Sequence, residues 1–275
     1  MRLKELLNRF LTDLSSLYTP EEIKAVFFRL TEHFYQIKRL DLAIDPDLRL
    51  PDKRLEAALP ELQQGKPWQY ITGEVTFCHL LLKVNSHTLI PRPETEELVD
   101  WVYKDWKGKS VKILDIGTGS GAIAIGLSAK LPQAKIAALD ISLEALQIAR
   151  ENAQDNRQDI EFIHQDIFSI EAHNLNYDII VSNPPYVRES EKKLMSDNVL
   201  KYEPANALFV PDRKALKFYD RILDLALKSC TKMVYFEINE YLKNELEELL
   251  NRKNLMDFTF KKDFFGKWRM LKVLI

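Results

Sequence analysis

Hydrophobic side chains at the front of the chain recur at the three- and four-residue spacing of amphipathic helices. One such stripe runs over residues 3–14 and a second over 23–34, and a third helix is expected over 54–64. Thr19 and Glu22 predict the start of the second helix, because the threonine hydroxyl can cap it while the glutamate carboxylate reaches back to the cap. The pattern therefore predicts a small helical bundle.

Strand-like runs replace the helical stripes from residue 74 onwards. The run EVTFCHLLLKVN, residues 74–85, predicts a two-stranded connector. Beyond it, helical segments alternate with the apolar runs VKILDIG, KIAALD, IEFIH, YDIIVSN and MVYFEI. Because parallel strands need crossover connections, this alternation predicts an α/β fold in which helices cover both faces of a parallel sheet. Ligands are then expected at the carboxyl ends of the strands.

These patterns divide the chain into three parts. We expect a helical domain over residues 1–70, a β-hairpin connector over 71–92 and an α/β domain over 93–275. The helical domain shows no mixed cluster of titratable side chains, so its expected role is to dock a substrate rather than to catalyse a reaction.

Composition and charge exclude several classes of protein. With 46% hydrophobic and 29% charged residues the chain is a soluble folded protein, and its net charge of −2 offers no strong attraction to nucleic acid or to an anionic membrane. The two cysteines, Cys78 and Cys230, provide neither a disulfide framework nor the spacing of a zinc site, so no metal is expected. No apolar run reaches ~18 residues and no secretion signal is evident, which predicts a cytoplasmic location.

Three of the eight glycines fall in one short segment, Gly117-Thr118-Gly119-Ser120-Gly121. This segment follows an apolar strand and opens a helix, where glycines let the backbone turn sharply and approach a ligand closely. With Ala122 it also matches the dinucleotide fingerprint, in which alanine is allowed at the third glycine position. The segment predicts a binding site for a nucleotide-like cofactor.

Two acidic residues follow the next two strands. Asp140 ends KIAALD, where a carboxylate can accept hydrogen bonds from both hydroxyls of a ribose. Asp166 follows IEFIH and is the corresponding candidate for an adenine amino group, with Ile167 or Phe168 against the ring. Both positions predict an adenosine-bearing cofactor, and both suit nicotinamide dinucleotides and S-adenosylmethionine equally.

The fourth strand ends in Asn183-Pro184-Pro185-Tyr186, a stiff loop in which neither proline can donate a hydrogen bond. The Asn183 side-chain oxygen and the Pro184 carbonyl could each accept an N–H from a planar NH2 group, and Tyr186 could pack its ring on that group. A delocalised nitrogen is not activated by simple deprotonation, so positioning and charge stabilisation have to do the work. The motif favours methyl transfer to planar nitrogen, with Asn183, Pro184 and Tyr186 as catalytic residues.

The segments GTGSGAIAI, LDIS and VSNPPYV resemble S-adenosylmethionine-dependent methyltransferases of Rossmann-like fold that act on planar NH2 groups. More specifically, GKPWQYITGEVTF, LIPRPETEELV and YEPANALF resemble the release-factor glutamine methyltransferase family, the HemK/PrmC type. The resemblance implies methylation of the glutamine side chain in the Gly-Gly-Gln motif of class I peptide chain release factors, in the bacterial cytoplasm, with S-adenosyl-L-homocysteine as the second product.

The resemblance also assigns residues to the two ligands. It implies that the cofactor is held by residues 117–121, by Asp140, by the turn of Asp166 and Ile167, and by Asn183. The glutamine would be held by residues 183–186, and the helical domain would meet the release factor, with no direct contact to nucleic acid or membrane.

Two alternatives share part of this pattern. A DNA or RNA amino-methyltransferase would use the same Asn-Pro-Pro-Tyr loop but needs basic surface to offset phosphates, which the net charge of −2 disfavours. The other is a nucleotide-binding module without catalysis, in which replacing Asn183 by alanine would leave every measurable phenotype unchanged.

The chain departs from the usual family pattern at a few positions. Asn239 and Leu242 stand where the family usually has glycine and glutamine, and residues 210–214 replace a glycine-rich stretch. We expect these positions to lie outside the proposed catalytic loop. Arg92 and Glu94 match the family's arginine-proline-glutamate segment, and their simplest role is to cap the helix that follows.

Overall fold

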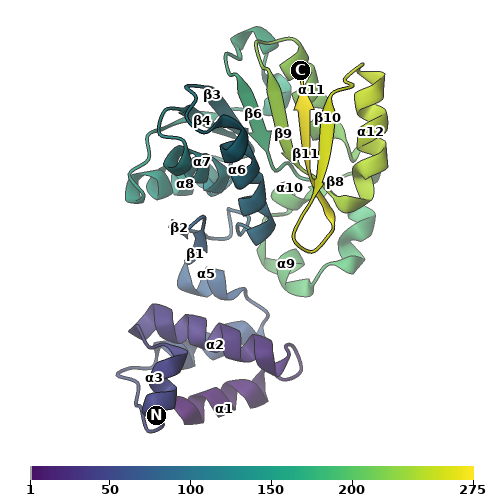
Figure 1. Cartoon of the computed structure of the whole chain (residues 1–275). Coiled ribbons are helices and arrows are strands. Elements are labelled where there is room, and N and C mark those ends of the chain that lie inside the picture. The colour runs from purple at the N-terminus through teal and green to yellow at the C-terminus, as the bar shows by residue number, and fades with distance from the viewer. Residues whose placement is uncertain (1) are drawn as a thin grey trace. The chain divides into compact units, whose positions relative to one another are not determined.

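The computed structural model describes residues 2–275, which form two compact units (Figure 1). The smaller unit contains the residues up to Gly73 together with Ser196–Tyr202, and the larger one contains Glu74–Met195 and Glu203–Ile275. None of the described helices is long and apolar enough to cross a membrane.

The smaller unit is a helical bundle around a core of leucine and phenylalanine side chains. Phe10 and Phe27 are fully buried and meet edge to face, with ring centroids 5.1 Å apart. The predicted capping box is confirmed: the Thr19 hydroxyl accepts the Glu22 N–H, and the Glu22 carboxylate accepts the Thr19 N–H at 2.8 Å. The helices are α1 (Leu3–Asp13), α2 (Pro20–Tyr35), α3 (Arg39–Ile44), α4 (Arg54–Gln63), α5 (Trp68–Thr72) and α9 (Asp197–Tyr202).

The larger unit is built on a seven-stranded sheet of order β10-β11-β9-β6-β3-β4-β5, which confirms the predicted α/β fold. The strands β9, β6, β3, β4 and β5 are parallel, and the C-terminal pair β10 and β11 adds an antiparallel edge. The strands are β3 (Lys112–Ile116), β4 (Lys135–Asp140), β5 (Ile160–His164), β6 (Ile179–Ser182), β9 (Met233–Glu237), β10 (Phe258–Lys262) and β11 (Trp268–Leu274).

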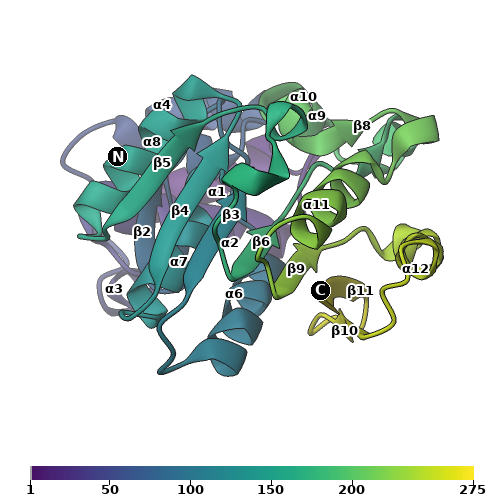
Figure 2. The ribbon, with the colours of Figure 1, turned by 90° about the horizontal axis from the view of Figure 1, so that it is seen from above.

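Helices cover both faces of this sheet (Figures 1 and 2). Helices α6 (Pro93–Trp106), α7 (Ala122–Lys130) and α8 (Leu143–Asp155) lie on one face, and the apolar sides of α11 (Lys217–Leu227) and α12 (Lys243–Arg252) bury the other. The remaining short elements are α10 (Ala205–Leu208), the parallel pair β7 (Val187–Arg188) and β8 (Phe209–Val210), and the 3₁₀ turns η1 (Ile167–Ser169), η2 (Ala172–Asn174), η3 (Glu189–Leu194), η4 (Asp212–Lys214) and η5 (Glu240–Leu242).

The predicted two-stranded connector is present as an antiparallel hairpin of β1 (Glu74–Phe77) and β2 (Leu80–Lys83). Its turn residues Cys78 and His79 have φ values of 49° and 64°, and positive φ at both central residues is what a type I′ hairpin turn requires. The buried Asn152 side chain of α8 holds the hairpin by accepting the Lys83 N–H at 2.6 Å and donating to the Lys83 carbonyl at 3.0 Å. The hairpin is thereby fixed to the sheet domain.

Candidate functional site

A cavity of about 500 Å³ opens at the carboxyl ends of the parallel strands. This volume lies within the range of sites that bind small molecules and cofactors. The predicted residues Gly117, Gly119, Asp140, Asp166, Ile167, Asn183, Pro184 and Pro185 line this cavity. Thr118, Ser120, Gly121 and Tyr186 are not among its lining residues.

The glycine loop connects β3 to α7. Its first two glycines leave the backbone open towards the cavity, while the two residues that alternate with the glycines are buried and fix the loop in place. Gly117 and Gly119 have positive φ values of 73° and 55°, and a Cβ built on either would meet no atom within 4 Å. Both therefore leave the backbone open towards the cavity. Thr118 and Ser120 are buried, and their polar groups bond within the protein: the Thr118 hydroxyl donates to Asp115 at 2.6 Å, and the Ser120 carbonyl accepts from Asn152 at 2.9 Å.

Gly121 is required for packing rather than for ligand binding. Its φ is +83°, and an added Cβ would lie 2.9 Å from the Ile125 Cδ1 atom and 3.1 Å from the Ala149 Cβ atom. Gly121→Ala should lower the melting temperature by several degrees, because strain and overpacking each cost ~1–2 kcal/mol. Gly108→Ala is the matched control, since Gly108 has a φ of +75° but open space around it. Equal melting temperatures for the two variants would contradict the packing role.

The Asp140 carboxylate stands beside the glycine loop. Its Oδ2 accepts the Gly119 N–H at 2.8 Å, and its Oδ1 accepts the Ser142 N–H at 3.0 Å. Each oxygen keeps a further lone pair for a ligand hydroxyl. The capping duty of α8 falls to Ser142, whose hydroxyl accepts the Ala145 N–H at 3.1 Å. Asp140 is thus oriented towards the cavity by two backbone donors.

Asp166 and its neighbours form the next part of the cavity wall. The Asp166 Oδ1 atom accepts the Phe168 N–H at 2.9 Å and so caps the turn η1. Ile167 is buried, while Phe168 is 44% exposed and packs against Phe218, with ring centroids 5.3 Å apart. The wall therefore offers apolar surface for a flat ring, next to one carboxylate.

Asp115 lies behind the glycine loop and is fully buried. Its Oδ2 accepts from the Thr118 hydroxyl and from the Ala124 N–H, whereas its Oδ1 has no hydrogen-bond partner within residues 2–275. Burial, together with the nearby Asp140 charge, raises the pKa of Asp115 to about 7. An ionised Asp115 is therefore unfavourable in the folded chain.

A stability measurement against pH tests this environment. The folded pKa of Asp115 lies above the unfolded value of ~3.9, so the folded state binds the proton more tightly, and the stability that Asp115 contributes below about pH 4 should be lost as pH rises to about 7. Asp115→Asn removes this contribution, so its curve of unfolding free energy against pH, measured by urea unfolding, should diverge from that of wild type between about pH 4 and about pH 7. Asp159→Asn, an exposed aspartate, should leave the curve unchanged. A wild-type slope retained by Asp115→Asn would refute the assignment.

A second, smaller cavity of about 130 Å³ adjoins the first, and Asn183 and Pro184 line both. Tyr186 lines only the smaller one, together with Arg92 and Glu237. The loop is held at its start by Ser182, whose buried hydroxyl donates to the Ile116 carbonyl at 2.7 Å. The Asn-Pro-Pro-Tyr loop is thus a rigid wall between the two spaces.

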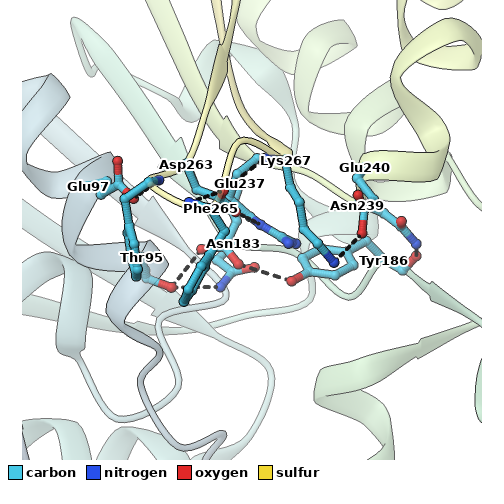
Figure 3. A network of polar contacts seen from close by, with 12 residues as sticks. Thr95, Glu97, Asn183, Tyr186, Glu237, Asn239, Glu240, Asp263, Phe265 and Lys267 are labelled. Carbon is cyan, nitrogen blue, oxygen red and sulfur yellow. Dashed lines mark hydrogen bonds and ion pairs between the residues drawn. The ribbon is translucent and has the colours of Figure 1, made fainter. Parts of the chain in front are cut away.

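Polar contacts behind this loop were not predicted from the sequence (Figure 3). The Tyr186 hydroxyl donates to the Glu237 Oε1 atom at 3.0 Å, and burial beside this carboxylate raises the pKa of Tyr186, so the phenol stays protonated. The Thr95 hydroxyl donates to the Glu237 Oε2 atom at 2.6 Å. Glu237 is only 2% exposed. A signal was present in retrospect, since a glutamate ending an apolar strand at this edge of the sheet needs partners when it is buried.

Two further outcomes concern the segments on which the family resemblance rested. The Arg92 guanidinium pairs with the buried Glu203 carboxylate at 2.5 Å, so it joins the LIPRPE and YEPANALF segments; its side chain makes no cap bond to α6. Asn239 follows β9 and lies outside the Asn-Pro-Pro-Tyr loop, but its side chain contacts that loop: its amide donates to the Tyr186 carbonyl at 3.4 Å and to Glu191 at 2.9 Å. A side chain longer than glycine reaches across from the end of β9.

Comparisons with known proteins agree with this arrangement. A family model described as methyltransferase small domain matches residues 93–208. The chain is 48% identical over 282 residues to a release factor glutamine methyltransferase of Flavobacterium psychrophilum. This alignment covers 99% of each chain. It is 43% identical to the protein of the same name in Bacteroides thetaiotaomicron, over 94% of this chain and 95% of that relative.

Solved structures share the fold at much lower identity. The catalytic domain of hMettl16 in complex with an RNA hairpin of the MAT2A 3′UTR aligns with a TM-score of 0.56 and 19% identity, over 70% of this chain and 73% of that one. The N-terminal domain of human METTL16 in complex with SAH aligns with a TM-score of 0.50 and 16% identity, over 70% and 74% of the two chains.

Proposed function

The chain belongs to the release factor glutamine methyltransferase family, and from this membership and the geometry of its two cavities we propose that it transfers a methyl group from S-adenosyl-L-methionine to the glutamine side-chain amide in the Gly-Gly-Gln motif of class I release factors. The proposed products are the N-methylated glutamine and S-adenosyl-L-homocysteine. The proposed setting is the bacterial cytoplasm, where such release factors act in translation termination.

One observation carries the proposal: Asn183 and Pro184 line both cavities. The larger cavity has the features that an adenosine-bearing cofactor needs, namely open glycine backbone, an oriented Asp140 carboxylate and apolar walls. The smaller cavity is of a size that suits a side chain rather than a cofactor. Two reactants bound in these spaces would meet at the Asn-Pro edge.

The residues of this chain fit the proposed cofactor. Asp140 would accept the ribose hydroxyls on its free lone pairs, and Asp166, Ile167 and Phe168 would surround the adenine. The cofactor, when bound, supplies a methyl group on a positively charged sulfur that is a good leaving group. Asn183 and Pro184, in the wall between the cavities, would shield this methyl group from bulk water. They would leave it accessible to the amide nitrogen of the substrate glutamine.

The chemistry proposed for the loop is positioning and charge stabilisation. The Asn183 side-chain oxygen and the Pro184 carbonyl would each accept one N–H of the glutamine amide, which fixes its nitrogen facing the larger cavity. Positive charge would develop on this nitrogen as the N–C bond forms and the S–C bond breaks with its electron pair left on sulfur, and the two oxygens would stabilise that charge. The ring of Tyr186 would pack on the flat amide. One N–H proton then leaves to solvent, so no buried base is required.

The decisive test is to incubate the full chain with methyl-labelled S-adenosylmethionine and a purified release factor, and then to locate the label by peptide mapping. The proposal expects one methyl group on the glutamine of Gly-Gly-Gln. A release factor carrying alanine in place of that glutamine is the control and should stay unlabelled. Label on an oligonucleotide instead would favour the nucleic-acid methyltransferase, and no transfer to either would favour a binding module.

A further inference from the structure

Glu237 joins two side chains that come from distant parts of the chain (Figure 3). It ends β9, and its buried carboxylate accepts from Thr95 in the first turn of α6 at 2.6 Å and from Tyr186 in the loop after β6 at 3.0 Å. Each carboxylate oxygen therefore holds one hydroxyl proton. Thr95 is itself buried, at 4% exposure, so water does not compete for its hydroxyl.

The contact with Glu237 limits what Thr95 can offer to its other neighbour. A threonine hydroxyl has a single proton, and here it points at the carboxylate. The Thr95 oxygen can then only accept, and it accepts from the Asn183 Nδ2 atom at 3.5 Å. If the Asn183 amide were turned over, its oxygen would face an oxygen with no proton to donate.

This sequence of contacts determines the orientation of the Asn183 amide. The nitrogen end is directed to Thr95, and the oxygen end is left for a ligand in the adjoining cavities. A substrate NH2 group is a pure donor, so only the oxygen end can bind it. In the reverse orientation two donors would face each other, and the substrate nitrogen would lose one of its acceptors.

The hydrogen bonds that run from Glu237 through Thr95 to Asn183 form a relay. This relay depends on an ionised Glu237, because a carboxylate accepts hydrogen bonds through both of its oxygens. Burial raises the pKa of Glu237, with a further increase from Glu94. The hydroxyls of Thr95 and Tyr186 and the positive charge of Arg269 on β11 act in the opposite direction. Arg269 is held in turn by the buried Asp263 at 3.2 Å. The charge is thus supported from three elements, α6, the loop after β6 and β11.

We propose that Thr95 and Glu237 are positioning residues that keep the Asn183 side-chain oxygen directed at the substrate nitrogen. This inference rests on the proposed function, and it adds Thr95, which lines neither cavity, and Glu237, which lines the smaller one. Thr95 lies in the PETEEL segment and Glu237 ends a strand, at a sequence separation of 142 residues.

The kinetic test compares Thr95→Val with Thr95→Ser in the full chain, using a purified release factor as substrate. Valine keeps the shape but removes the hydroxyl, whereas serine keeps the relay. Thr95→Val should lower kcat ~10-fold, which converts to ~1.4 kcal/mol and is the effect of losing one hydrogen bond, while KM for the release factor and the Kd of S-adenosylhomocysteine stay within ~2-fold. Thr95→Ser should restore kcat to within ~2-fold of wild type.

Thr231→Val is the matched control. Thr231 is also buried and donates its hydroxyl to the Tyr177 carbonyl at 3.1 Å, but it lies before β9, at the end opposite to Glu237. The Thr231→Val variant should be less stable than wild type but should have the same kcat. Equal kcat values for Thr95→Val and Thr95→Ser would overturn the inference, and so would an equal loss in Thr231→Val.

A second measurement does not depend on activity. In protein labelled with ¹⁵N-asparagine, the Asn183 side-chain NH2 signals are assigned by their absence in Asn183→Ala. They should coincide in wild type and Thr95→Ser and shift in Thr95→Val, because the acceptor of the amide is lost. Unshifted signals would refute the relay even if no release factor is methylated. If wild type is inactive while the signals shift as expected, the relay stands and only the proposed function fails.

Discussion

Replacing Asn183 by alanine should lower kcat for release factor methylation by ~10²-fold or more, the usual effect of removing one preorganised group that stabilises developing charge. Of the two proposed acceptors of the substrate N–H groups, only the Asn183 side chain can be deleted, because the Pro184 acceptor is a backbone carbonyl. Its loss leaves the substrate nitrogen with one acceptor instead of two. Binding of the release factor at distant surfaces should be unaffected, so kcat falls more than KM changes.

The same variant separates catalysis from cofactor binding. Asn183 also lines the larger cavity, but Asp140 and the apolar walls remain, so the Kd of S-adenosylhomocysteine measured by calorimetry should change by less than ~5-fold. Asn251→Ala, on the exposed side of α12, is the control and should match wild type in both measurements. An Asn183→Ala enzyme with unchanged kcat, or one that has lost only thermal stability, would remove this residue from the mechanism.

The parts of the site that depend on local sequence could be predicted. Strand-then-helix periodicity gave the parallel sheet, and in such a sheet all strand ends meet at one edge. The glycine segment, Asp140, Asp166 and the loop beginning at Asn183 each follow a strand, so their convergence on one cavity follows from topology. This convergence does not depend on any specific contact between distant side chains.

The supporting contacts could not be predicted, because each depends on two distant segments. Thr95 reads as an ordinary helix residue and Glu237 as a strand end, and only the fold brings their side chains to 2.6 Å. Asn152 is similar: its position in the middle of α8 gives no sign that it ties the hairpin to the glycine loop. The short helices α3 and α5 were also missed, since six and five residues are too few for a periodic stripe.

Substitutions at Asp140 should show the complementary effect, a loss of cofactor affinity with little loss of turnover at saturating cofactor. The carboxylate would give two charge-assisted hydrogen bonds to the ribose, and hydrogen bonds to charged groups contribute ~1.5–3 kcal/mol each. Allowing for partial replacement by water, Asp140→Ala should raise the Kd of S-adenosylhomocysteine ~10- to 100-fold.

A complication is that Asp140 also accepts the Gly119 and Ser142 N–H groups, so its removal leaves two backbone donors without their partner. Asp140→Asn distinguishes the two roles, because its oxygen can still accept one of these N–H groups, while the charge that favours the ribose hydroxyls is gone. Asp140→Asn should therefore keep the melting temperature closer to wild type than Asp140→Ala does, yet still weaken cofactor binding. Asp159→Ala, an exposed carboxylate before β5 at the opposite edge of the sheet, is the control. If Asp140→Asn bound S-adenosylhomocysteine as tightly as wild type, the carboxylate would serve the glycine loop alone, and the cofactor would have to be held by other groups.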